Sequence, residues 1–141
     1  MNLSGMDLSG HNFLLADFSG ANLTGVNLER AHMHSADLSH ARLERADLAN
    51  ASLVGAILSN ANLTGADLSG ADLSDARLDH ANLSQARIRN ANLSGARLWR
   101  ANVTGAYLEG TNFKAADLLG ADLTGAHTPR VCREHSHGQC R

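Results

Sequence analysis

A five-residue period runs through almost the whole sequence and limits its possible folds more than any other feature. Each unit contains a small apolar residue, a short polar residue, a large apolar residue and two residues suited to turns, as in Ala61–Gly65. The large apolar position, which we call the centre, recurs at every fifth residue from Leu3 to Leu123, and 19 of these 25 centres are leucine. Because no insertion interrupts the register, the fold must repeat with the same period.

Neither a helix nor a straight strand suits this period. In a helix, a step of five residues turns by roughly 140°, so the centres would spread over every face. In a straight strand, an odd step would place successive centres on opposite faces. Both conflicts disappear if the chain turns a corner after each unit, with Ala and Leu inward, Asn or Asp outward, and glycine tolerating a positive φ at the corner. Such turns stack like parallel strands about 4.8 Å apart and form a solenoid stabilised between neighbouring coils.

The two positions before each centre make the pattern more specific. Alanine lies two residues before each centre from Ala16 to Ala126, except at Val26 and Thr111, and Asn or Asp lies between them in 17 of the 25 units. This A-(D/N)-L-x-x pattern resembles that of the pentapeptide-repeat family. The resemblance implies an all-β fold, a right-handed quadrilateral parallel β-helix with four units per coil and about six coils over residues 1–126. Residues 127–141 would form a short irregular tail, rich in Cys, His and Arg and expected to be flexible.

With twenty residues per coil, the outward side chains form columns. One column is mostly asparagine (Asn2, Asn22, Arg42, Asn62, Asn82, Asn102 and Asp122), and its amides are expected to hydrogen-bond along the column. The first coil has Met1, Met6 and His11 in place of the inward alanines, which predicts a cap on the open end. Leu14 and Leu15 occupy corner positions, where they either help to close this end or mark a contact.

Charge is unevenly distributed, and no known catalytic motif is present. Residues 1–76 contain nine carboxylates and three arginines, a net charge of −6, whereas residues 77–141 carry +4. The chain has no phosphate loop, nucleophile elbow or HExxH motif, and a leucine-filled tube leaves no ordinary pocket, so we expect no catalytic residues and no enzyme activity. The absence of a long apolar run and of a signal-like N-terminus predicts no membrane contact and a cytoplasmic location.

The resemblance also implies a function. Some bacterial pentapeptide-repeat proteins resemble a DNA duplex in width and charge, bind DNA gyrase or topoisomerase IV, and modulate the inhibition of these enzymes. The sequence therefore predicts a non-enzymatic binding protein, a DNA mimic for a gyrase or topoisomerase, that binds no nucleic acid directly. The candidate partner-binding residues are Asp7, Asp17, Glu29, Asp37, Asp47, Asp67, Trp99 and Leu119. A homodimer through the C-terminal end, as in the dimeric gyrase binders of the family, would have Trp99 and Leu119 as its apolar contacts here.

Two alternatives remain open at this point. The first is a generic protein-interaction scaffold, for which Ile57, Trp99 and Leu119 are the best candidates for an exposed apolar patch. Arg97 and Arg100 flank Trp99, as at binding hot spots, although either guanidinium could simply lie over the indole.

The second alternative assigns the function to the tail, with the coil as a carrier. Cys132, His135, His137 and Cys140 form a C-x2-H-x-H-x2-C arrangement, whose thiolates and imidazoles suit zinc or copper. The tail could instead be disordered, be enzymatically modified, or hold a Cys132–Cys140 disulfide in an oxidising compartment. Deletion of residues 128–141 would abolish all function only under this alternative.

Overall fold

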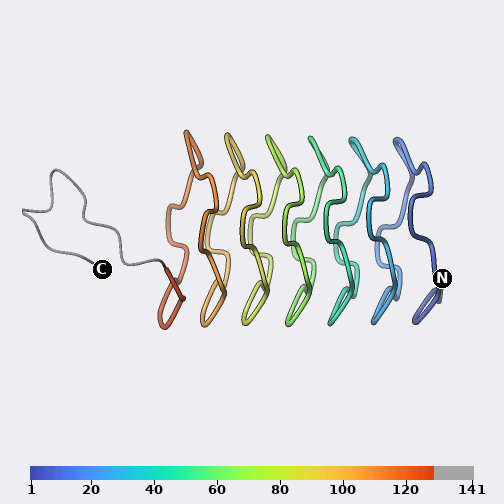
Figure 1. The fold of residues 1–141 in the computed structure, drawn as a ribbon, viewed down its shortest axis with the longest axis horizontal. Coiled ribbons are helices and arrows are strands. Elements are labelled where there is room, and N and C mark those ends of the chain that lie inside the picture. Colours follow the sequence, from blue (N-terminus) through green and yellow to red (C-terminus); the bar gives the residue numbers. More distant parts are fainter. Residues whose placement is uncertain (129–141) are drawn as a thin grey trace, which may run out of the picture.

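The computed structural model describes residues 1–128 and shows a single stack of coils, a parallel β-helix (Figure 1). Parallel bridges join each outward residue to the residue twenty positions later, from Asn2↔Asn22 to Tyr107↔His127. Within residues 1–128 the β-structure consists of these single-residue bridges rather than longer strands, and there is no helix. The twenty-residue register agrees with the expected four five-residue units per coil.

Backbone hydrogen bonds tie each coil to the coils on both sides. Asn22 donates its N–H to the carbonyl of Met1 at 2.9 Å, and Leu23 donates to the carbonyl of Arg42 at 2.7 Å. Gly25 donates to Glu44 at 2.9 Å, so each unit forms one bond backward and two forward. This pattern recurs along the stack and pairs backbone N–H and C=O groups of neighbouring coils by hydrogen bonds, without any long strand.

The corners explain why the outward position favours Asn and Asp. The Oδ1 atom of every one of the 17 Asn and Asp residues at this position accepts the N–H two residues later, as from Ser69 to Asp67 at 2.9 Å. The expected ladder of amides in the Asn2 column is therefore wrong, because these oxygens are engaged at their own corners. The one amide–amide contact between coils within residues 1–128 joins Asn112 to Asn92 at 3.5 Å, in another column, and the Asn62 amide instead donates to Glu44 Oε1 of the preceding coil at 3.1 Å.

Each corner ends on a residue with positive φ, at every fifth position from Gly5 to Gly125. Twelve of these residues are glycine and thirteen are not. Leu15, at φ 59°, is the one large branched apolar residue among them, and its side chain is 70% exposed. A side chain of this kind is disfavoured in the left-handed conformation. Because the Leu15 side chain is exposed, no burial of apolar surface offsets this conformational cost.

The core is the expected column of leucine with alanine beside it. From Leu23 to Val103 every centre is at most 1% exposed, as are the alanines two residues before the centres in this range. At the first coil, Leu3, Leu8 and Phe13 are only partly buried, and His11 stacks on Phe13 with the ring centroids 5.9 Å apart. Met1 and Met6 remain 70% and 45% exposed, so the predicted cap covers this end only in part. Leu14 and Leu15 are also exposed, which favours a contact over closure of the end.

Candidate binding surfaces

The structure divides the predicted partner-binding residues between two sides of the rod. One column, which we call the Asp7 face, contains Asp7, Asn27, Asp47, Asp67, Arg87, Tyr107 and His127. A second column, the Ile57 face, contains Asp17, Asp37, Ile57, Arg77, Arg97 and Asp117. The two columns are ten residues apart, which is half a coil, so they lie on opposite sides of the tube. The predicted acidic residues therefore form two separate surfaces, as the twenty-residue register implies.

The aspartates of the Asp7 face are held by hydrogen bonds at their own corners. The hydroxyl and the N–H of Ser9 both donate to Asp7 Oδ1, at 2.7 and 3.1 Å, and these bonds lower the pKa of Asp7. Asp47 accepts the N–H of Ala49 at 3.0 Å in the same way, and Glu29 lies at the corner that follows Asn27. The hydrogen bonds found for these aspartates in residues 1–128 use Oδ1 alone, which leaves the second oxygen for a partner.

A cluster at the far end of the same face was not predicted. The Nε of Arg89 lies 2.7 Å from Glu109 Oε2, and this contact is the main cause that lowers the pKa of Glu109. The Arg89 guanidinium also lies 4.8 Å from the ring centroid of Tyr107, which stacks on His127 at 4.3 Å. The signal was present in the sequence, because residues 89 and 109, like residues 107 and 127, are twenty positions apart.

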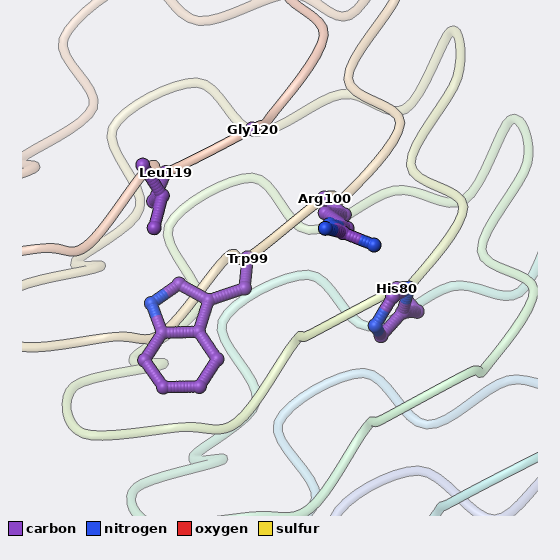
Figure 2. A pocket seen from close by; sticks show the side chains of 5 residues that line it. All are labelled: His80, Trp99, Arg100, Leu119 and Gly120. Atoms are coloured by element: carbon purple, nitrogen blue, oxygen red, sulfur yellow. The ribbon is translucent and has the colours of Figure 1, made fainter.

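A shallow depression of about 500 Å³ lies at a corner beside the Ile57 face. Figure 2 shows its lining by His80, Trp99, Arg100, Leu119 and Gly120, which come from three successive coils. Trp99 is 41% exposed and Leu119 is 74% exposed. The predicted proximity of Trp99 and Leu119 is therefore observed, whereas Ile57 is half-buried, lies two coils before Arg97 and does not line the depression.

Trp99 is held by two neighbours on the rod. The Arg97 guanidinium lies 4.8 Å from its ring centroid, so the alternative of an arginine over the indole is observed for Arg97. The pKa of Asp117 is lowered first by the Trp99 side chain, whose one donor is the indole N–H, then by the N–H of Leu119. These contacts orient the indole while part of it stays accessible to a partner.

The predicted metal ligands Cys132, His135, His137 and Cys140 lie outside the described residues, 1–128. Within those residues, no three His, Cys, Asp or Glu side chains are grouped so that they could hold a metal ion. In the same part of the chain, no helix has the length and apolar character needed to cross a membrane.

Comparison with known proteins identifies the family. The family model for pentapeptide repeats matches residues 2–34, 31–70, 56–95 and 91–127, and the chain belongs to this family. The solved structure of Rfr23, a pentapeptide repeat protein from the cyanobacterium Cyanothece 51142, is 32% identical over 92% of this chain and 88% of its own, with a TM-score of 0.43. A pentapeptide repeat protein from Nostoc PCC 7120 is 38% identical over 67% and 69%, with a TM-score of 0.46.

A third similar structure has a named biological role. Trypsin-treated QnrB1, described as a plasmid-mediated fluoroquinolone resistance protein, is 23% identical over 90% of this chain and 77% of its own, with a TM-score of 0.49. At this identity and TM-score the likeness supports no inference about the partner of this chain. No curated protein sequence matches the chain significantly.

Proposed function

We propose that the chain is a six-coil, right-handed quadrilateral rod without enzyme activity that binds a protein by imitating DNA. The Asp7 face of the acidic half would enter a basic DNA-binding groove, and gyrase or topoisomerase IV is the partner to test first. The observation that carries this proposal is the column of corner-held carboxylates on a narrow rod, at Asp7, Asp47 and Asp67. Action on these enzymes would place the protein in the cytoplasm.

The charge density of the acidic half suits this role. Residues 1–76 carry a net charge of −6. At twenty residues and about 4.8 Å per coil these residues extend for about 18 Å, which gives one negative charge per roughly 3 Å. One strand of duplex DNA carries one charge per about 3.4 Å, and both strands together one per about 1.7 Å. The acidic half therefore resembles a single backbone in charge density, whereas the arginine-rich half would be repelled by a basic groove and should project from it.

The test is a DNA-supercoiling assay with purified gyrase, titrated with the full chain. We expect inhibition of supercoiling, or protection from a gyrase poison, at up to tens of micromolar protein. Deletion of residues 128–141 should leave this effect unchanged; its complete loss would instead assign the function to the tail. A full chain without any effect on gyrase would refute the proposal for this enzyme.

A matched pair of triple variants tests the surface. The variant D7N/D47N/D67N removes three charges from the Asp7 face, and Asn27 in the same column shows that asparagine forms the same corner, with its Oδ1 3.0 Å from the Glu29 nitrogen. The control D72N/D75N/D122N removes three charges from other positions. We expect the first variant to lose at least tenfold in potency and the control to lose little. Equal loss in both would show that only overall charge matters.

An interaction scaffold is the second candidate, because Trp99 and Leu119 expose apolar surface beside the depression. This candidate predicts that W99A/L119S abolishes partner binding while the D7N/D47N/D67N variant retains it. In the supercoiling assay, the DNA-mimic proposal predicts the opposite order of sensitivity.

A further inference from the structure

Along the Ile57 face, the charged residues before Ile57 are acidic and those in the two coils after it are basic. Over five coils the bridged residues are Asp17, Asp37, Ile57, Arg77 and Arg97, that is, two acids, one apolar residue and two bases. Asp17 and Arg97 each lie two coils from Ile57, and Asp37 and Arg77 each lie one coil from it. None of the other three outward columns in residues 1–128 has this antisymmetric order.

We propose that two copies of the chain associate in antiparallel orientation through the Ile57 face. A two-fold axis through Ile57, parallel to the strand direction, places Asp17 of one copy opposite Arg97 of the other and Asp37 opposite Arg77. The pairing then gives four ion pairs around a central contact between the two Ile57 side chains. Because both copies have the same coil spacing, about 4.8 Å, the pairs stay in register along the whole contact.

The charged groups of this face form no ion pair within residues 1–128, although the Arg97 guanidinium lies over the Trp99 ring and would have to reach Asp17 of the second copy from there. Asp17 and Asp37 each use only Oδ1 for the corner, where Ser19 and Ser39 donate their hydroxyls at 2.6 Å. Arg77 is exposed and forms no ion pair within residues 1–128. Within one copy, Asp17 lies above Asp37, and like charges at this spacing are destabilising. Opposite charges from a second copy would relieve that repulsion.

The two edges of the face are also complementary in size. In the antiparallel arrangement each edge meets the same edge of the other copy. Leu14 and Leu15, which are 58% and 70% exposed, then lie opposite the small residues 94–95 (Ser and Gly). Trp99, which is 41% exposed, lies opposite the small residues 19–20 (Ser and Gly). This arrangement gives the strained, exposed Leu15 a role that the folding of one chain does not provide.

The area predicts a weak and salt-sensitive dimer. Five coils span about 24 Å and one five-residue unit at most about 16 Å, so each copy contributes roughly 400 Å². The total of roughly 800 Å² lies below the range of stable interfaces, so we expect a weak dimer that forms only at low salt and high protein concentration. Because the four pairs are at the surface, salt at about 0.5 M should weaken the dimer strongly.

This contact is independent of the proposed DNA mimicry. It covers Asp17, Asp37 and Trp99 but leaves the Asp7 face, on the opposite side of the rod, accessible. It also differs from a dimer through the C-terminal end, since Leu119 lies beyond the coils that pair. The failure of either proposal therefore leaves the other intact.

Charge exchange tests the pairing by sedimentation velocity at 50 and 500 mM salt, with protein up to several hundred micromolar. The wild type should dimerise at low salt, while D17R/D37R alone and R77D/R97D alone should remain monomeric. An equimolar mixture of the two variants should form a heterodimer, because every arginine again faces an aspartate. Arginine already occupies this position at Arg42 and Arg87, so the fold accommodates the change, and recovery in the mixture would itself show that both variants fold.

Crosslinking provides a second test through the two-fold axis. In a C132S/C140S background, I57C should form a covalent dimer with a short bis-maleimide, while N82C on another face should not. A wild type that stays monomeric at low salt, a single-exchange variant that dimerises like the wild type, or a mixture that fails to associate would each overturn the proposal. Dimerisation abolished by L119S but unaffected by charge exchange would overturn it in favour of the C-terminal end.

Discussion

The cost of shortening one leucine should depend on where its coil lies in the stack. Leu63 is the centre of a unit in the middle of the stack and has no exposed surface. Leu43 and Leu83, one coil before and one coil after it, are equally enclosed. Leu63→Ala leaves a cavity that neighbouring coils on both sides hold open, so we expect a loss of about 3–5 kcal/mol in the free energy of unfolding. Leu3 is partly buried and belongs to the first coil, so Leu3→Ala should cost only about 1–1.5 kcal/mol.

The measurement is urea denaturation followed by far-ultraviolet circular dichroism, with fluorescence of the single tryptophan, Trp99, as a second probe. Leu119→Ala is the control, because the same chemical change at a side chain that is 74% exposed should leave stability almost unchanged. Coincident transitions by the two probes would establish that the stack unfolds as one unit. Equal losses for Leu63→Ala and Leu3→Ala would refute the argument that stacking on both sides determines stability.

Three further predictions concern the corners. Leu15→Gly should raise the free energy of unfolding by about 1 kcal/mol, because Leu15 has a φ of 59° and buries little surface; a loss of stability in thermal denaturation would contradict this. Gly20→Ala should cost about 1 kcal/mol from its φ of +68° alone, and Gly70→Ala should cost more, since its Cβ would lie 2.3 Å from Asn50 Oδ1; equal melting temperatures would show that Asn50 moves away without cost. Ser19→Ala should raise the pKa of Asp17 towards its ordinary value of 3.8 in an NMR titration, because the Ser19 hydroxyl is the main group that lowers it. A carboxylate with a lowered pKa stabilises the folded state above that ordinary value and loses this contribution as the pH falls through the folded pKa, so Ser19→Ala should flatten the acid side of the stability curve below about pH 4.

The repeat itself made most of the fold predictable. The failure of both helix and straight strand to accommodate a step of five required a corner after each unit, and the inward Leu and Ala positions followed from it. The role of Asn and Asp was harder to predict, because Oδ1 can accept either from the next coil or from the residue two positions later. The structure shows the local bond at Asn62, whose Oδ1 lies 3.1 Å from the Thr64 nitrogen. Because this oxygen is already used at its own corner, it has little capacity left for a ladder of amide hydrogen bonds between coils.

The candidate surfaces were less predictable than the fold. The five-residue period does not fix the number of units per coil, and the resemblance to the pentapeptide-repeat family supplied the value of four. With that number, the columns could be written down, including the separation of Asp7 from Asp17 on opposite sides. Side-chain orientation was not accessible in this way: Arg89 could have faced solvent, and its contacts with Tyr107 and Glu109 depend on rotamers that the pattern does not specify.

The twenty-residue register has a consequence for how this chain tolerates changes in length. An added block of twenty residues would lengthen the rod by one turn and leave each later side chain on its original side. An added block of five would keep every leucine inside, yet it would rotate all later residues by a quarter turn and exchange one surface for the next. A deletion of a single unit near residue 50 would thus preserve the fold but move every later outward side chain to a different face of the rod. Gain and loss of repeats during evolution should therefore proceed in sets of four wherever a surface is under selection, and in single units where only the interior matters.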